Sequence, residues 1–474
     1  MDDVFGRQKE KAALDELLAS GKAEFIAVYG RRRVGKTFLI NEYLKDQIVF
    51  QVTGVMNDNA QSQYDTFRQA LDEYGYPNPT ENTWMELFYA LQKLLRSKVD
   101  SERVCVVFID ELPCFDTPRA NFISALEHFW NAWASKHNNL KLIVSGSATS
   151  WMIKQIIDNH GGLHNRITHE MHLQPFTLKE TEDYLKMRRI PWNRFIITQA
   201  YMVFGGVPYY LSLINAKESL AQTIDRLYFV RQAPLQREYG RLMASLFRTP
   251  EPYVKIIETL SARRQGLMRE DIAKELPNLA GGRLSKMLEE LEGCDFIRSY
   301  HTREKKIKQN QKIYQLTDMF SLFHLHFFPK GITDNHFWQS NQNNPLVTVW
   351  QGLAFEQVVM QHIEQIKQAL GIAGVRAEIC PWRSKNTDNC AQVDMLIVRA
   401  DRIVNLCEMK FSINTFTIDK QYDAELRNKI QVFQTETHCK YGIHLTMLTT
   451  YGITPNAYAN HVQSSLTMDV LFGE

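Results

Sequence analysis

The sequence lacks the features of secreted and membrane-spanning proteins. Its 474 residues include only seven cysteines, an odd number scattered along the chain, which argues against a disulfide scaffold and fits a reducing compartment. No uninterrupted apolar run approaches the roughly 18 residues of a membrane span, and the start, Met1-Asp2-Asp3, has no charged-then-apolar targeting pattern. These absences predict a cytoplasmic protein without a membrane partner.

An excess of charge of one sign is also missing. Lysine and arginine together number 55 and the acidic residues 53, so net charge argues neither for nor against a nucleic-acid partner, and any basic surface must be local. Long low-complexity tracts and fixed-period repeats are absent as well. The length predicts about two to four domains with ample hydrophobic core.

What the sequence does contain is a phosphate-binding pattern, G-x-x-x-x-G-K-[ST], at residues 30–37. The apolar run before it (25–29) predicts a buried strand, and the apolar spacing after it (38–43) predicts a helix. This order turns backbone N–H groups toward one point at a helix N-terminus, which suits the phosphates of ATP; a chance glycine turn is the alternative. We expect Lys36 to reach the β/γ-phosphates and Thr37 to hold Mg²⁺. The predicted nucleotide-binding residues are Gly30, Arg31, Arg32, Arg33, Val34, Gly35, Lys36, Thr37 and Phe38.

A second apolar run, residues 104–109, predicts another buried strand and ends in Asp110-Glu111. We assign Asp110 to the metal ion and Glu111 to the base that activates water. Further strands are predicted near 49–52 and 142–144, and helices alternate with them, so we expect a doubly wound parallel sheet with the ligand at the strand C-termini. Ser147, after the last of these strands, could sense the γ-phosphate or simply cap a helix.

Two residues further along have less specific contexts. Arg166 could neutralise transition-state charge in a neighbouring subunit of a homo-oligomer, and a surface salt bridge explains it equally well. The segment 205–210 contains Pro208, which sets a rigid turn at a helix junction. That turn could pack on the adenine or be a structural helix break.

Between residues 252 and 327 the pattern indicates three helices (254–260, 269–276 and 282–292), followed by two strands (296–300 and 312–316) that could pair. Helices followed by a ribbon are typical of a winged helix. The third helix would place Arg283 and Lys286 in the DNA major groove while the basic connection touches phosphates. A lid on the nucleotide site explains the same pattern. The basic residues of the connection are Arg303, Lys305, Lys306 and Lys308.

The last third holds a second set of chemically capable residues. Segments 392–398 and 402–410 read as a hairpin, and they carry Asp394, Glu408 and Lys410. Residues two apart in a strand share a face, so Glu408 and Lys410 point the same way. Two carboxylates and a lysine can bind Mg²⁺ and direct water against a phosphodiester. Such residues also occur on ordinary half-exposed strands.

This C-terminal pattern resembles the PD-(D/E)xK nuclease core, which implies that Asp394 and Glu408 bind metal, that Lys410 is catalytic and that a helical acid, here Glu356, is a further metal ligand.

The first half resembles the prokaryotic STAND/AAA+-related "archaeal ATPase" family. That resemblance implies that Gly6 and Arg7 approach the nucleotide, that Pro208 lies over the base and that Arg166 occupies an arginine-finger position, although Asn165 replaces the usual glycine. It is carried in order by Gly6-Arg7-x-x-Glu10, the phosphate loop, Asp110-Glu111, Gly146 to Ser150 and Gly206 to Pro208.

We therefore predict an α/β protein with a P-loop ATPase core (1–175), a helical lid (176–250), a winged helix (251–328) and a nuclease-like, restriction-endonuclease-type domain (329–474). The predicted function is an ATP-dependent switch or motor that controls a Mg²⁺-dependent nuclease-like domain acting on DNA, for which defence against foreign DNA is a fitting role. The alternatives are a signalling ATPase with a catalytically inactive C-terminal domain and a DNA-binding regulator.

Overall fold

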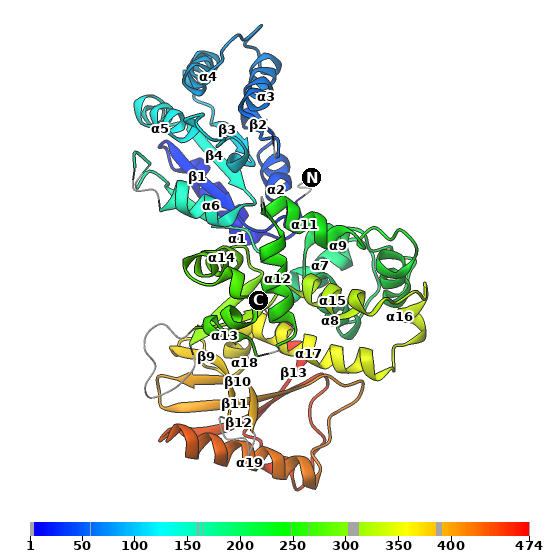
Figure 1. The fold of residues 1–474 in the computed structure, drawn as a ribbon. Coiled ribbons are helices and arrows are strands. Elements are labelled where there is room, and N and C mark those ends of the chain that lie inside the picture. Colours follow the sequence, from blue (N-terminus) through cyan, green and yellow to red (C-terminus); the bar gives the residue numbers. More distant parts are fainter. Residues whose placement is uncertain are drawn as a thin grey trace. The chain divides into compact units, whose positions relative to one another are not determined.

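The computed structural model describes residues 4–56, 58–158, 161–163, 165–247, 249–263, 265–301, 312–384 and 391–473. The chain divides into two compact units (Figure 1). The first unit comprises Met1–Pro175, Gly240–Pro250 and Glu289–Asp295. The second comprises Phe176–Tyr239, Glu251–Leu288 and Phe296–Glu474.

A five-stranded parallel sheet forms the centre of the first unit, in the order β2-β3-β4-β1-β5. Strands β3 and β4 are buried along their whole length because helices cover both faces. The predicted α/β architecture with a parallel sheet is confirmed. The strands are β1 (Glu24–Tyr29), β2 (Ile48–Thr53), β3 (Cys105–Asp110), β4 (Leu140–Gly146) and β5 (His169–His172).

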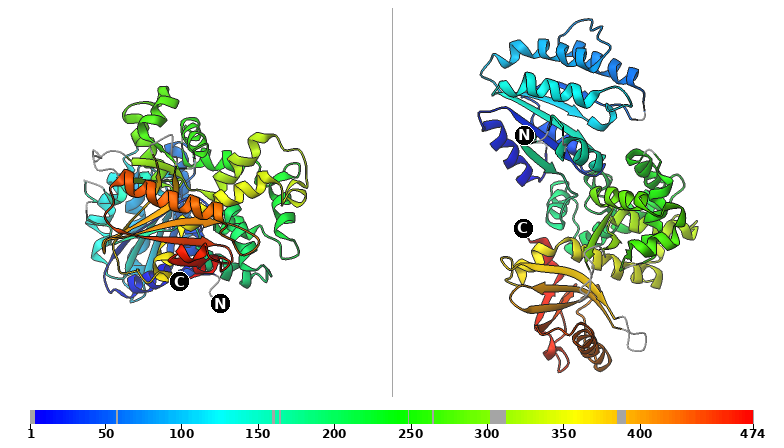
Figure 2. Two further views of the ribbon diagram at one scale, coloured as in Figure 1. Left: turned by 90° about the horizontal axis from the view of Figure 1, so that it is seen from below. Right: turned by 60° about the vertical axis from the view of Figure 1, so that its left-hand side comes forward.

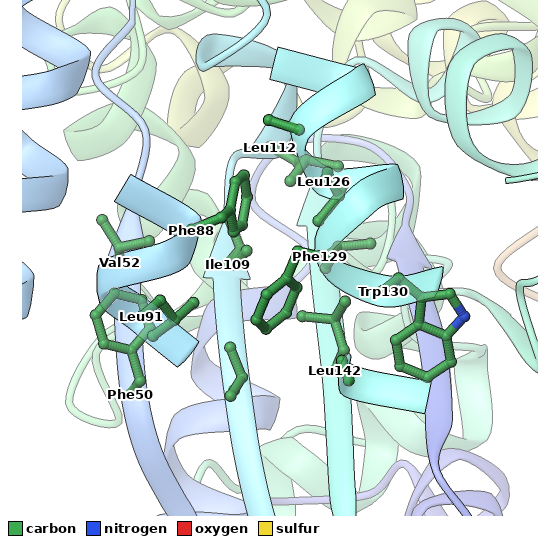
Figure 3. Packing of buried hydrophobic residues seen from close by; sticks show 14 of the residues in the cluster. Phe50, Val52, Phe88, Leu91, Ile109, Leu112, Leu126, Phe129, Trp130 and Leu142 are labelled. Atoms are coloured by element: carbon green, nitrogen blue, oxygen red, sulfur yellow. The ribbon is translucent and has the colours of Figure 1, made fainter. Parts of the chain in front are cut away.

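The two faces of this sheet carry separate hydrophobic clusters. Helices α3 (Ala60–Glu73), α4 (Trp84–Val99) and α5 (Phe122–Ala132) pack on one face, and α1 (Gln8–Ala19) and α2 (Lys36–Tyr43) pack on the other (Figure 2, right). Figure 3 shows the first cluster, in which Phe88 and Leu91 of α4 and Phe129 of α5 meet Ile109 and Leu142 of the strands. The short helix α6 (Thr149–Met152) follows β4.

The amino-terminal part of the second unit is helical and contains α7 (Leu178–Met187), α8 (Arg194–Phe204), α9 (Pro208–Ser212) and α10 (Leu220–Ile224). Farther along the chain come α11 (Glu238–Leu246), most of which belongs to the first unit, and the predicted three helices, α12 (Glu251–Ser261), α13 (Arg269–Glu275) and α14 (Gly282–Gly293), the last of which ends in the first unit. The predicted strands β7 (Ile297–His301) and β8 (Lys312–Leu316) pair antiparallel, and a short strand that we did not predict, β6 (Leu267–Met268), pairs with β8. The basic connection from Arg303 to Lys308 lies outside the described residues.

The second unit ends in another five-stranded sheet, in the order β13-β12-β11-β10-β9. The predicted hairpin is present, with Met395 of β10 opposite Cys407 of β11. The strands are β9 (Ala377–Arg383), β10 (Gln392–Arg399), β11 (Ile403–Lys410), β12 (Gly442–Thr449) and β13 (Ser464–Thr467). The accompanying helices are α15 (Met319–Phe327), α16 (Phe337–Ser340), α17 (Pro345–Gln361), α18 (Ile363–Ala369) and α19 (Lys420–Thr437). None of the helices in the described part of the chain has both the length and the apolar sequence that a membrane crossing needs.

Candidate functional site

The predicted phosphate loop lies between β1 and α2 at the carboxyl end of the central parallel strands. Its backbone takes positive φ angles at Gly30 (143°), Arg33 (77°) and Gly35 (93°). Glycine is required at position 30, because a Cβ atom there would lie 2.2 Å from the carbonyl oxygen of Leu173. Gly35 is the N-cap of α2. The loop therefore leads directly into a helix N-terminus, where backbone N–H groups favour an anion.

Lys36 points back over its own loop. Its Nζ donates hydrogen bonds to the carbonyl oxygens of Gly30 (2.9 Å) and Arg31 (3.2 Å) and to Oγ of Ser147 (2.9 Å). Burial lowers the pKa of Lys36, and the nearby carboxylates of Glu111 and Asp110 oppose this shift. A buried ammonium group that is bound only to neutral oxygens is well placed to exchange them for phosphate oxygens.

Asp110 and Thr37 meet as predicted for a metal site. Thr37 Oγ1 donates to Asp110 Oδ2 over 2.8 Å, and Ser145 of β4 donates to Oδ1 of the same carboxylate. Burial raises the pKa of Asp110, and the hydrogen bonds from Ser145 and Thr37 lower it in part. A threonine hydroxyl and a carboxylate at the end of a parallel strand form the pair that holds Mg²⁺ in phosphate-loop ATPases.

Glu111 is held by Ser147. The Ser147 hydroxyl donates to Glu111 Oε1 (2.6 Å) and the Ser147 backbone N–H donates to Oε2 (3.1 Å). Glu111 has a left-handed backbone (φ 47°) immediately after β3, an uncommon conformation for a residue with a side chain. One serine thus contacts both Lys36 and Glu111, which links the predicted phosphate ligand to the predicted base.

Other predicted nucleotide residues also surround the loop. Arg7, left-handed at φ 58°, caps α1 and donates from Nη2 to the carbonyl oxygen of Val34 (3.1 Å), so the Gly6-Arg7 segment is joined to the loop. Arg32 contacts the sulfur of Met56 (3.1 Å). Arg31 is buried, whereas the Phe38 side chain is 53% exposed at the start of α2.

None of the described contacts joins Arg166 or Pro208 to the phosphate loop. Arg166 is exposed, and its backbone N–H bonds to the carbonyl oxygen of Leu163. Pro208 is the first residue of α9 in the second unit, just after Gly205 and Gly206 with φ of 63° and 67°. The proline therefore starts a helix after a left-handed turn, and its contact with adenine stays a prediction, as does the arginine-finger role of Arg166.

The second predicted site brings two of its carboxylates together. The β10–β11 register puts Asp394 level with Glu408, and Asp394 Oδ2 accepts a hydrogen bond from the backbone N–H of Met409 (2.9 Å). Glu408 is only 1% exposed. Burial, and secondly the charge of Asp394, raises the pKa of Glu408 to about 7.

Two residues of α19 complete this cluster: Tyr422, which we had not predicted, and Lys429, which belongs to a helical segment (425–429) that resembles a later part of the nuclease family. Lys429 donates from Nζ to Glu408 Oε2 (2.6 Å), and the Tyr422 hydroxyl donates to the same oxygen (3.3 Å). Lys410 lies over the Tyr422 ring, 4.9 Å from its centroid. Tyr422 and Lys429 are seven positions apart on one helix, a spacing that places both on one face. That spacing was the sequence signal that could have identified them.

The structure does not bring Glu356 together with Asp394 and Glu408, and its role as a metal ligand stays a prediction. Glu356 lines a separate cavity between α12, α15 and α17. The neighbouring Phe355 contacts Phe411, with ring centroids 5.3 Å apart. Helix α17 contacts β11, whereas the Glu408 side chain is bound by Lys429 of α19. In the described residues no group of three or more Asp, Glu, His or Cys side chains is placed to hold a metal ion.

The geometry of the first unit defines a P-loop ATPase domain, and comparison with known proteins agrees. Residues 4–214 match a family described as an ATPase domain predominantly from Archaea. The family match ends well before Asp394 and Glu408.

Individual relatives are distant. An uncharacterized protein of Methanocaldococcus jannaschii is 25% identical over 374 residues, which cover 76% of this chain and 77% of that protein. A Walker-type ATPase of Pyrococcus abyssi aligns at 19% identity and a TM-score of 0.48, over 69% of this chain and 97% of its own. The ORC2 protein of Aeropyrum pernix aligns at 14% identity and a TM-score of 0.40, over 72% and 97%. The assignment of the ATPase domain rests on the family match and on the loop geometry.

Proposed function

We propose that the chain binds ATP with Mg²⁺ at residues 30–37 and hydrolyses it. Lys36 and the N-terminus of α2 would hold the phosphates, Thr37 and Asp110 would hold the metal ion, and Glu111 would orient and deprotonate the attacking water. When bound, Mg²⁺ neutralises charge on the phosphate oxygens. The observation that carries this proposal is the hydrogen-bonded series from Lys36 through Ser147 to Glu111.

The same series supports a role for Ser147 in orienting the base. Lys36 donates to the Ser147 hydroxyl, and Ser147 donates to both carboxylate oxygens of Glu111. A γ-phosphate that takes the hydrogen bond of Lys36 would leave the two bonds from Ser147 to Glu111 in place. Ser147 would therefore keep the Glu111 carboxylate directed at the attacking water.

We further propose that the C-terminal domain is a nuclease-like module that acts on DNA with Mg²⁺. The donor set fits a cation, because Glu408 Oε1 is buried without a hydrogen-bond partner and the Asp394 carboxylate is close enough to raise the pKa of Glu408. A buried carboxylate oxygen without a donor is strongly unfavourable unless a cation or proton binds it. Two carboxylates with water completing the shell are a common Mg²⁺ arrangement. Lys410 would then stabilise developing negative charge.

The winged-helix assignment of residues 251–328 belongs to this proposal. Helices α12 to α14 with the sheet β6-β8-β7 have the expected order. On α14, Leu284, Met287, Leu288 and Leu291 are buried, while Arg283 and Lys286 are exposed. An exposed basic face on the third helix supports DNA contact, so we propose that this domain couples nucleotide state to the C-terminal domain.

A second candidate function, a signalling ATPase with a catalytically inactive C-terminal domain, is favoured by a specific contact. The Lys429 ammonium group lies 2.6 Å from Glu408, where it supplies the positive charge that a metal ion would otherwise supply. With Glu356 directed elsewhere, the site has one carboxylate fewer than the sequence predicted.

Plasmid nicking and ATP turnover by the purified chain separate these candidates. The wild type, Lys36→Ala and Lys410→Ala would be incubated with supercoiled plasmid, Mg²⁺ and ATP. Glu425→Gln, on an exposed part of α19, is the matched control. Nicking that is lost in both lysine variants and retained in the control supports the coupled nuclease. ATP turnover that depends on Lys36, without nicking in any chain, supports the inactive module. Absence of turnover in the wild type refutes the ATPase assignment.

A further inference from the structure

An exposed aromatic ring lies where two parallel strands of the C-terminal sheet end. Strands β11, β12 and β13 are parallel, so their carboxyl ends meet at one edge, the edge at which α/β sheets bind ligands. Lys410 is the last residue of β11, and Tyr451 follows the end of β12 by two residues. Neither proposed activity uses Tyr451.

Hydrogen bonds join the segment that carries Tyr451 to the segment that carries Lys410. The backbone N–H of Thr450 donates to the carbonyl oxygen of Lys410 (3.2 Å), and the backbone N–H of Ser412 donates to Oγ1 of Thr450 (2.8 Å). Thr450 itself is fully buried. Because these bonds link the residues next to Tyr451 to the end of β11, the backbone sets the position of Tyr451 relative to Lys410.

The Tyr451 ring belongs to an ordered group of aromatic side chains. Phe195 of α8 contacts the Tyr451 ring, with centroids 5.9 Å apart and planes 23° apart. Phe195 also contacts Phe411, with centroids 5.0 Å apart and planes 3° apart. Phe411 in turn contacts Phe355 of α17. Two helices therefore hold this aromatic group in place, with nearly parallel rings, which is a favourable arrangement.

This aromatic group ends in an exposed ring. Tyr451 is 43% exposed, and Ile413, in the segment after β11, is 73% exposed. Among the described residues, Phe195 is the aromatic partner of Tyr451. A ring that is already held in place loses little conformational entropy when another flat ring stacks on it. The exposed ring is therefore suited to stacking on an aromatic ligand.

A positive charge lies at the same edge of the sheet. The Lys410 ammonium group lies over the Tyr422 ring, and no carboxylate of the described residues forms a salt bridge with it. Burial, and secondly the charge of Asp469, raises the pKa of Tyr451, but Asp469 is paired with Arg194 at 2.9 Å. A free cation beside an exposed aromatic ring is the combination by which proteins bind single nucleic-acid strands, through phosphates and stacked bases.

We propose that Tyr451, supported by Phe195 and Phe411, stacks on an unpaired base of a DNA strand whose phosphate Lys410 contacts. This inference rests on the nuclease-like function proposed above and adds a substrate class to it, namely DNA with unpaired bases. A base inside a duplex is covered on both faces by its neighbours, so it must leave the stack before it can bind the ring. Tyr451 is a positioning residue that holds the strand and takes no part in bond cleavage.

Fluorescence anisotropy with labelled oligonucleotides tests the proposal. The full chain would be titrated without Mg²⁺, so that cleavage does not interfere, with a single strand of about 12 thymidines, with an abasic strand of the same length and with a duplex. The wild type should bind the base-bearing strand at least about fivefold more tightly than the abasic strand, the lower end of the effect of base stacking. It should also bind the single strand more tightly than the duplex.

Variants assign this preference to the ring. Tyr451→Ala should bind the base-bearing and abasic strands equally, whereas Tyr451→Phe, which keeps a ring, should retain the preference. Tyr458→Ala is the matched control, because Tyr458 is another exposed tyrosine of the same domain that makes no aromatic contact among the described residues. Lys410→Ala should keep the preference for bases, but the slope of log affinity against log salt should fall by about 0.7, the contribution of one phosphate contact.

Three results would overturn the proposal. The first is equal affinity of the wild type for base-bearing and abasic strands, or tighter binding of the duplex. The second is an unchanged preference in folded Tyr451→Ala, which places the stacking ring elsewhere. The third is loss of the preference in Tyr451→Phe as well, which makes the hydroxyl group rather than the ring responsible. Plasmid nicking by a chain without base preference would overturn this inference alone, whereas no binding of any oligonucleotide would overturn the DNA-directed function as well.

Discussion

Replacing Glu408 with glutamine should stabilise the C-terminal domain, and the gain should grow with pH. Burial and the charge of Asp394 raise the pKa of Glu408 from 4.5 to about 7. A group whose pKa is raised by folding contributes stability that is fully present below the unfolded pKa, and that stability is lost as the pH rises through the folded pKa. The affected window is therefore pH 4.5 to 7.

The magnitude follows from the shift. One pKa unit corresponds to about 1.36 kcal/mol, so above pH 7 the ionised Glu408 destabilises the native state by up to about 3 kcal/mol relative to an uncharged side chain. At pH 5 the same difference is below about 1 kcal/mol, because folded Glu408 is protonated and unfolded Glu408 is only partly ionised. Glutamine keeps an acceptor for Lys429 and has no charge to bury.

The assay is hydrogen exchange of β11 and α19 peptides, read as local free energies of opening at pH 5 and pH 8. Wild type, Glu408→Gln and the exposed control Glu425→Gln would be compared at each pH, so that the pH dependence of chemical exchange cancels. The control should change the free energy of opening by less than about 0.5 kcal/mol at either pH. Adding Mg²⁺ at pH 8 should protect the wild type more than Glu408→Gln, since only the wild type has the buried Glu408 carboxylate for the cation to neutralise.

An equal loss of protection in Glu408→Gln at both pH values would refute this reasoning. It would mean that the ion pair with Lys429 stabilises the native state by more than burial of the Glu408 charge destabilises it.

Three further predictions concern other parts of the chain. Gly30→Ala should destabilise the first unit by several kcal/mol, since a Cβ would lie 2.2 Å from the Leu173 carbonyl oxygen, and thermal unfolding compared with Gly21→Ala measures it. Ser147→Ala should lower ATP turnover about tenfold or more with little change in ATP affinity, because Glu111 loses its 2.6 Å partner; a loss confined to affinity would contradict this. Burial lowers the pKa of His362 to about 4, so stability present above pH 6.5 should fall by up to about 3 kcal/mol as the pH drops toward 4, and unfolding curves of His362→Gln should lack that component.

The nucleotide site could be predicted from the sequence because its parts are consecutive. The loop joins a buried strand to a helix with no intervening residues, so local geometry alone aligns Gly30, Gly35 and Lys36. Asp110 is distant in sequence but ends a neighbouring parallel strand, and parallel strands present their carboxyl ends at one edge. The strand β4 also ends at this edge, so the same rule places Ser147, which follows β4, near Glu111.

The C-terminal site could be predicted only in part, because its residues come from elements whose packing the sequence does not specify. The hairpin was predicted from the two apolar segments, and its register places Asp394 level with Glu408. The position of Glu356 depended on which face of the sheet α17 covers. A helix can bury either of two neighbouring residues, and here Phe355 contacts Phe411, directly after β11, while Glu356 lines a cavity.

Whether the C-terminal domain binds a metal ion depends on a competition at one carboxylate. Glu408 Oε2 is bound by Lys429, whereas Oε1 has no hydrogen-bond partner in the described structure. If the Lys429 ammonium group fully offset the buried negative charge of Glu408, burial would not hold the pKa of Glu408 near 7. Lys429→Met removes the competitor and leaves Asp394 and Glu408 in place. It should therefore raise Mg²⁺ affinity, measured by calorimetry, if the cation and the lysine share one position. Lower affinity in this variant would instead mean that Lys429 orients Glu408 for the metal ion, and that the two positive charges occupy different oxygens of the carboxylate.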